Sequence, residues 1–272
     1  MKFAQGFLMP LLLSCLLLFI TSCSKKNDGG SGNETTYVTV EFDNIVGGQN
    51  LFLNTGSYTN AAGETFSVSM LQYFVSNFTL TASNGSEYTV DQDSSYFLIN
   101  ESDPQTRHAR LKVPVGDYVK LRFIIGVDSL RSTMDISKRT GVLDPAAGDE
   151  HGMYWGWNSG YIFFRLEGTS DVAPLDPSGA RKFRYHIGGF GGYSTPTINN
   201  IREVDLDLRS SGVLMARSGR TANVHLMADL LSVFNGTTNL SIAANPTVMF
   251  SDFSVHVANN YQHLFHHHHT EN

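Results

Sequence analysis

Alternating apolar and polar residues dominate the chain and predict short β-strands. Residues 37–42 (YVTVEF), 66–70 (FSVSM) and 204–208 (VDLDL) place apolar side chains at every second position, which is the period of a half-buried strand. Residues 72–81 form a further strand, and Asn84-Gly85 follows them as a dipeptide typical of tight hairpins. The pattern therefore favours an all-β fold.

Helical signals are few and short. Residues 228–234 read as a short helix stopped by Gly236, residues 248–257 as a last strand, and residues 259–265 as a terminal helical turn. Residues 131–150 form a long connection, and such loops in a compact domain are usually functional or disordered. We therefore predict a single antiparallel β-sandwich, of Greek-key or immunoglobulin-like type, with long loops and one or two short helices.

The N-terminus has the pattern of an export signal. Lys2 precedes an apolar run over residues 7–20, which is shorter than a comfortable membrane span. The run ends in Ile20-Thr21-Ser22-Cys23, which resembles the lipobox of bacterial lipoproteins. We expect residues 1–22 to be a signal peptide, Cys23 to carry lipid, and the polar residues 23–36 to be a flexible tether. The predicted location is the cell envelope, with the protein anchored by lipid to the outer membrane at its periplasmic or surface face.

Composition excludes several classes of function. The net charge of −6 disfavours nucleic acid as a partner. Both cysteines, Cys15 and Cys23, fall within the signal and its lipid site, so the domain has no thiolate for a zinc or iron–sulfur site. A soft-metal site must then use His, Met or a modified side chain. The sequence lacks a Gly-x-Ser-x-Gly elbow, a His-Glu-x-x-His motif and a P-loop, so we predict a protein that is not an enzyme.

Residues 151–168 (HGMYWGWNSGYIFFRLEG) concentrate the candidate chemistry. In an extended segment, residues two apart share a face, so His151, Met153, Trp155 and Trp157 would align. That face would carry an imidazole, a thioether and two oxidisable rings. A core strand in which the tryptophans supply bulk explains the same pattern.

The ten histidines are the other candidate ligands. His186 stands where a strand meets a glycine cluster, a place that can expose a ring nitrogen on a rigid element. A hydrogen-bonded strand histidine explains the same placement. His225 and His256 lie within strand patterns and are interpreted as structural. Residues 259–272 are interpreted as a His-rich tail, in which His267 and His269 would capture metal with lower affinity.

Several segments together resemble the MbnP family of copper-binding lipoproteins and periplasmic proteins, which includes the methanobactin-associated ones. The similarity runs in order from Tyr37 to the C-terminus, and its most specific part is Met-x-Trp-x-Trp-x-Ser-Gly-Tyr. The segments that carry it are GVDS (126–129), GVLDP (141–145), GMYWGWNSGY (152–161), LEG (166–168) and FRYHIGG (183–189), with Met249-Phe250, VANNY (257–261), Phe265 and the C-terminal histidines.

The resemblance implies a copper site built on a modified tryptophan. In characterised relatives a di-haem cytochrome c peroxidase-like partner oxidises a tryptophan to kynurenine, and two histidines and the new aryl amine hold copper. Intact indole offers no ring lone pair to a metal, so opening the ring creates a ligand. This chain departs from the better-known members, which place a histidine two residues from that tryptophan. Here Met153 precedes Trp155 and Ser159 follows Trp157 at that distance.

These observations predict a non-enzymatic protein that binds copper, as Cu(I) or Cu(II), for uptake, storage or delivery. Residues 37–258 would form the copper-binding sandwich. His151 and His186 would be imidazole ligands, Met153 a possible thioether ligand, and Trp155 or Trp157 the oxidised residue. The alternative is a surface carbohydrate-binding or adhesion module in which both tryptophans and Tyr161 form an exposed platform. The direction in which the indole rings point distinguishes the two.

Overall fold

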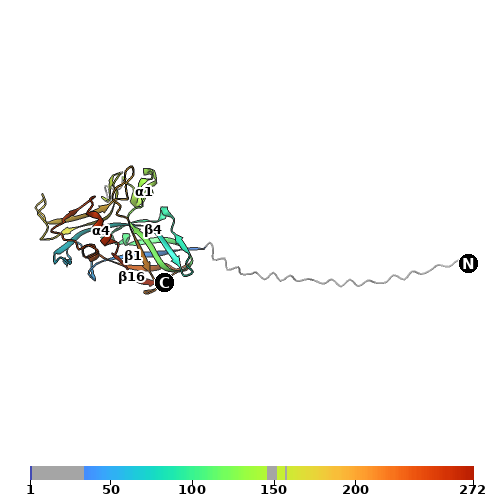
Figure 1. Cartoon of the computed structure of the whole chain (residues 1–272). Helices are drawn as coiled ribbons and strands as arrows, with labels where there is room; N and C mark the ends of the chain where they lie inside the picture. The colour runs from blue at the N-terminus through green and yellow to red at the C-terminus, as the bar shows by residue number, and fades with distance from the viewer. Residues whose placement is uncertain (2–33, 146–151, 157) are drawn as a thin grey trace. The chain divides into compact units, whose positions relative to one another are not determined.

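The computed structural model describes Met1 and residues 34–145, 152–156 and 158–272, and the described residues from Glu34 onward form one compact unit. Within these residues the strands form two sheets (Figure 1). The five-stranded sheet contains β1 (Thr35–Val46), β2 (Gln49–Asn50), β7 (His108–Pro114), β14 (Ala222–Asp229) and β16 (Phe265–Glu271).

The eleven-stranded sheet is organised around the long strand β4, which pairs with β10 over its first part and with β8 over its second part. Its strands are β3 (Tyr58–Thr59), β4 (Thr65–Ala82), β5 (Glu87–Thr89), β6 (Tyr96–Asn100), β8 (Gly116–Ile125), β9 (Tyr154–Gly156), β10 (Gly160–Thr169), β11 (Lys182–Gly188), β12 (Arg202–Asp207), β13 (Leu214–Ala216) and β15 (Thr247–Val248).

Helices are short in the described part of the chain. They are α1 (Ser129–Thr133), α3 (Leu231–Phe234) and α4 (Ser254–Tyr261), with the 3-10 turns η1 (Gln92–Ser94), η2 (Pro104–Arg107), η3 (Ile136–Lys138) and η4 (Gly141–Leu143). Asp128 caps α1 by accepting a hydrogen bond from the backbone N–H of Arg131 at 2.9 Å. Among the described residues, no helix is both long and apolar enough to cross a membrane.

The alternating pattern of the sequence becomes the two faces of each sheet. Val38, Val40 and Phe42 of β1 are buried, whereas Glu41 and Asp43 face outward with partial exposure. The inward side chains of both sheets belong to one apolar cluster. Phe42 of the five-stranded sheet meets the rings of Tyr73 and Phe123 of the other sheet at centroid distances of 6.3 and 5.8 Å. The two sheets therefore pack against each other through a shared core.

A second apolar cluster lies on the other side of the eleven-stranded sheet. It contains Phe74, Leu98, Val127, Leu143, Met153, Tyr161, Ile162, Phe163 and Phe190, with Tyr96, Tyr154, Trp155 and Ile201 packed against it. Strand β9 forms its cover, because β9 pairs antiparallel with the start of β10. The segment that holds the candidate chemistry is therefore anchored by packing of its own.

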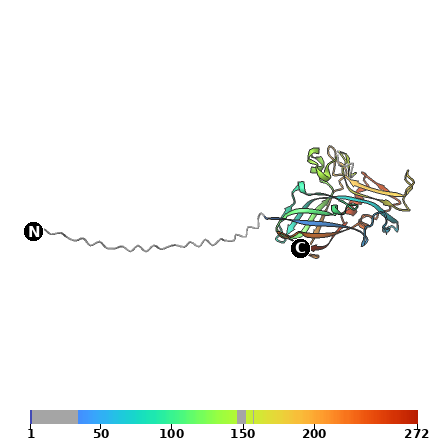
Figure 2. The ribbon, with the colours of Figure 1, turned by 180° about the vertical axis from the view of Figure 1, so that it is seen from behind.

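The β-rich prediction is confirmed, and the strand order refines it. β1 pairs in parallel with β14, and β11 with β15, so the sheets are not purely antiparallel. The prediction of a strand over residues 248–257 is wrong, since β15 ends at Val248 and α4 begins at Ser254. Leu264 and Phe265 enter the shared core, and Figures 1 and 2 show β16 beside the other strands of its sheet. The His-rich segment is therefore an edge strand and not a free tail.

Candidate metal centre

His186 lies on the outward face of β11 and is held there by a carboxylate on the neighbouring strand. Phe183, Tyr185 and Ile187 point into the shared core, so the alternation of the strand turns His186 away from it. Its Nε2 lies 2.8 Å from Oε1 of Glu167 on β10. Arg165 donates to the same oxygen, with Nε at 2.8 Å and Nη2 at 2.7 Å. The three side chains form one partly buried charged group.

This arrangement fixes the direction and the tautomer of the imidazole. The hydrogen bond from His186, followed by that from Arg165, holds the pKa of Glu167 at about 2 although burial opposes the shift. Glu167 is therefore ionised at neutral pH and can only accept hydrogen bonds, so His186 must donate from Nε2. In the neutral ring, Nδ1 then keeps its lone pair for another partner. Metal-binding histidines commonly have this kind of carboxylate support.

The indole of Trp155 lies against the same face of β11. A Cβ added at Gly188 would lie 2.8 Å from Cζ3 of Trp155, and it would also collide with the carbonyl oxygen of Tyr161. The absence of a side chain at Gly188 thus makes room for the indole. Gly188 is two residues from His186, a step of about 7 Å along a strand on one face. The ring of Phe250 packs edge-on against the indole at a centroid distance of 6.1 Å.

The structure separates the remaining candidates of this segment. Met153 is 2% exposed and belongs to the second apolar cluster, so a metal would have to enter that cluster to reach its sulfur. Tyr161 is also 2% exposed, and its hydroxyl donates to the carbonyl of Leu143. Such a buried ring cannot join an exposed sugar platform, which argues against the carbohydrate alternative. His151 and Trp157 lie outside the described residues.

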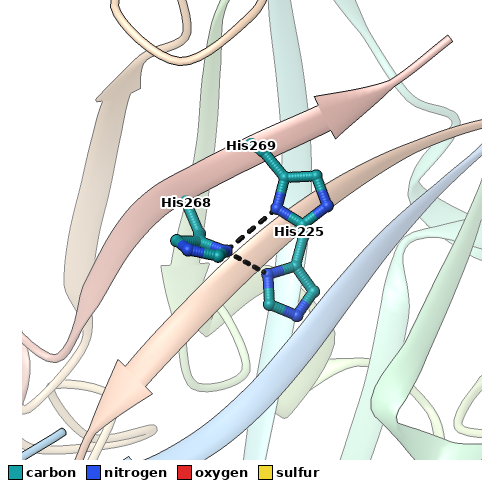
Figure 3. Close-up of side chains that lie close together, drawn as sticks. All are labelled: His225, His268 and His269. Atoms are coloured by element: carbon teal, nitrogen blue, oxygen red, sulfur yellow. Dashed lines mark hydrogen bonds between the residues drawn. The ribbon is translucent and has the colours of Figure 1, made fainter.

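A second group of histidines lies on the outward face of the five-stranded sheet. His225 of β14 and His268 and His269 of β16 place ring nitrogens within 4.8 Å of one another (Figure 3). The interpretation of His225 as merely structural missed this group, because its partners come from a strand that the sequence did not predict. His269 belongs to the group, whereas Nε2 of His267 bonds to the hydroxyl of Thr270 at 2.9 Å. Burial lowers the pKa of His225.

The family model MbnP matches residues 35–250, which is most of the chain. The chain belongs to the MbnP family. The solved structure of MbnP from Methylosinus trichosporium is similar in fold, with a TM-score of 0.54 and 18% sequence identity. That match covers 81% of this chain and 82% of the other one. No curated protein sequence matches the chain.

The residues that match the MbnP model include the whole face around His186, but they include only part of the group formed by His225, His268 and His269. Trp155, Glu167 and His186 all lie inside residues 35–250, whereas His268 and His269 lie beyond them. Membership of the MbnP family is therefore relevant to the face of β10 and β11. The histidine group of the other sheet has to be judged from its own geometry.

Proposed function

We propose that the chain is a non-enzymatic copper-binding protein of the cell envelope that takes up, stores or delivers copper. Copper binds on the outward face of β10 and β11, with Nδ1 of His186 as one ligand. His151 supplies a second imidazole, and the side chain at position 155 or 157 supplies a weaker nitrogen donor once it has been modified. Methanobactin-associated copper handling in the MbnP family supports this proposal.

The pairing of His186 with Glu167 beside Trp155 is the observation that carries the proposal. The carboxylate orients the imidazole and makes it a stronger donor, while Arg165 balances the negative charge. Imidazole nitrogens suit copper, and Cu(I) accepts few ligands. Met153 could add a thioether only if the second apolar cluster opened, so we assign it a minor role.

The proposed modification converts one tryptophan, preferentially Trp155, into kynurenine. Oxidation by two equivalents of peroxide, activated by a di-haem cytochrome c peroxidase-like partner, opens the bond between C2 and C3 of the indole and gives N-formylkynurenine and two waters. Hydrolysis then releases formate and leaves an aryl amine. Peptide mass spectrometry of protein from the native host should show a gain of about 4 Da on one tryptophan. Unmodified tryptophans at full copper occupancy would exclude this step.

Attachment to a membrane through lipid on Cys23 completes the proposal. It places the domain at the outer membrane, facing the periplasm or the surface, on a tether of residues 23–36. Metabolic labelling with a fatty acid should mark the wild-type protein but not Cys23→Ala. Equal labelling of both would contradict this attachment.

The ligand role of His186 is tested by competitive titration with Cu(I) against a chromophoric chelator. All the proteins titrated carry His268→Gln, so that the group of His225, His268 and His269 (Figure 3) contributes little to copper binding. Adding His186→Gln should weaken the tightest site by at least about 10-fold, since a ligand matters at least as much as its supporting partner. Adding His263→Gln, a change at an exposed histidine, should have no effect. Equal affinities for the two variants would refute the assignment of His186.

A further inference from the structure

Three imidazoles converge on the outward face of the five-stranded sheet, away from the face of His186. Nδ1 of His268 lies 3.2 Å from Nδ1 of His225 and 2.9 Å from Nδ1 of His269. Figure 3 shows both contacts, with the ring of His268 turned toward the other two. The rings of His225 and His269 lie nearly parallel, with an interplanar angle of 28° and centroids 4.8 Å apart. The same nitrogen of each ring thus points to one place.

An irregularity in β16 brings the two neighbouring histidines to the same side. His269 pairs with His225 across the sheet, but the next pair is His267 with Leu226, so His268 is an extra residue between them. In a regular strand, adjacent residues face opposite sides of the sheet. The bulge breaks this alternation and allows His268 and His269 both to approach His225.

Carboxylates support the outer nitrogens of two of these rings. Nε2 of His225 lies 3.6 Å from Oδ2 of Asp43 on β1, and Nε2 of His269 lies 3.4 Å from Oε1 of Glu271. A carboxylate favours a hydrogen on the nitrogen that faces it, which leaves Nδ1 of each ring with a lone pair. His268 can then supply the hydrogen for its contacts with both rings. A bound cation would take the place of that hydrogen, which would move to Nε2 of His268 through solvent.

We propose that His225, His268 and His269 form a second metal site, which binds a divalent first-row transition metal through their three Nδ1 atoms. Nitrogens bound at about 2.0–2.1 Å in tetrahedral geometry are about 3.3 Å apart, close to the 3.2 and 2.9 Å that separate Nδ1 of His268 from Nδ1 of His225 and of His269. Half-exposed His269 and exposed His268 leave a fourth position open to water. Neutral imidazoles favour Cu(II) over Zn(II), and Asp43 and Glu271 balance the charge of the ion.

This site is independent of the proposed copper site at His186 and goes beyond that function. The two faces are the outward faces of sheets that share one core, and packed sheets lie about 10 Å apart, so no side chain serves both. His268 and His269 also lie beyond the residues that match the family. Occupation of one site should therefore leave the affinity of the other unchanged.

Zn(II) is the first probe, because it reports imidazole sites without redox chemistry. In competition with a chromophoric chelator, His268→Gln in the full-length chain should weaken zinc binding by about 100-fold, and Asp43→Asn, which removes one supporting carboxylate, by about 10-fold. His266→Gln is the matched control, since it makes the same change at an exposed position of the same strand. Equal zinc affinities for His268→Gln and His266→Gln would overturn the proposal.

Electron paramagnetic resonance with Cu(II) provides a readout of the ligands themselves. In the His186→Gln background, which removes the first proposed copper site, the spectrum at one equivalent should show hyperfine splitting from three equatorial nitrogens, and adding His268→Gln should give fewer. Equal thermal unfolding midpoints for His268→Gln and His266→Gln would show that β16 remains folded in both. In the His186→Gln background, a Cu(II) spectrum that does not change on adding His268→Gln would contradict the site even if zinc affinity fell.

Discussion

Replacing Glu167 with glutamine removes one negative charge from the β10–β11 face while keeping an oxygen at the same place. Among the described residues, His186 and Arg165 both donate hydrogen bonds to Oε1 of this carboxylate. The glutamine oxygen can accept the same bonds if the amide nitrogen points away. The variant therefore isolates the charge of Glu167 from its shape.

The size of the effect follows from the pKa of the carboxyl group. In the folded protein the pKa of Glu167 is about 2, against an ordinary value of 4.5. A folded-state pKa below the unfolded one stabilises the protein above the unfolded value, and this contribution disappears as the pH falls from about 4.5 to about 2. The two values differ by an amount equivalent to about 3 kcal/mol. This is an upper bound, because a fifth of the side chain (20%) is exposed to screening by solvent.

Urea unfolding at several pH values measures this contribution. At neutral pH, Glu167→Gln should lower the free energy of unfolding by about 2 kcal/mol. The difference from wild type should shrink steadily below about pH 4.5. Glu203→Gln, at a carboxylate that is 60% exposed, is the control and should change stability little. A loss of stability that is the same at neutral and acid pH would refute the role of the charge, as would no loss at neutral pH.

Three further changes test other parts of the structure. Gly188→Ala should destabilise the protein by about 1–3 kcal/mol and shift the tryptophan fluorescence, because the added Cβ would collide with Trp155 and the Tyr161 backbone. In the control Gly116→Ala, the added Cβ would meet only the Tyr118 ring, at 3.7 Å, so neither the stability nor the fluorescence should change. Glu64→Gln should lower the free energy of unfolding in urea by about 2–4 kcal/mol. The reason is that buried Glu64 accepts hydrogen bonds from the side chains of Asn60 and Ser241 and from the N–H groups of Ile242 and Ala243. An unchanged free energy of unfolding would contradict this. Glu167→Gln should also weaken Cu(I) binding about 10- to 100-fold, and an unchanged affinity would mean that Glu167 does not support the ligand.

The β-rich fold could be predicted because the alternation of apolar and polar residues within each strand shows which side chains are buried. The alternation of residues 37–42 predicted the inward Val38, Val40 and Phe42 of β1 correctly. The pairing of the strands could not be predicted, since alternation within a strand does not show which other strand lies beside it. The parallel pairing of β1 with β14 brings together residues about 180 positions apart, and nothing in either segment specifies it.

The candidate site, like the fold, could be predicted only as far as it depends on single strands and not on their pairing. The position of His186 where a strand meets a glycine cluster indicated that its ring nitrogen could be exposed on a rigid element, with a hydrogen-bonded strand histidine as the alternative. Its partner Glu167 could be identified only from the pairing of β10 with β11. The histidine group needed two facts that a linear pattern does not contain: the pairing of β14 with β16, and the bulge at His268. A signal for β16 was present in Leu264-Phe265, whose side chains are almost fully buried. The run of histidines obscured it by suggesting a solvated tail.

Anomalous X-ray scattering at the copper edge, from crystals of the protein loaded with one equivalent of Cu(I), tests the copper site most directly. We predict a peak about 2 Å from a ring nitrogen of His186, beside the indole-derived side chain on the outward face of β10 and β11. A single peak at His225, His268 and His269, with no density at His186, would contradict it.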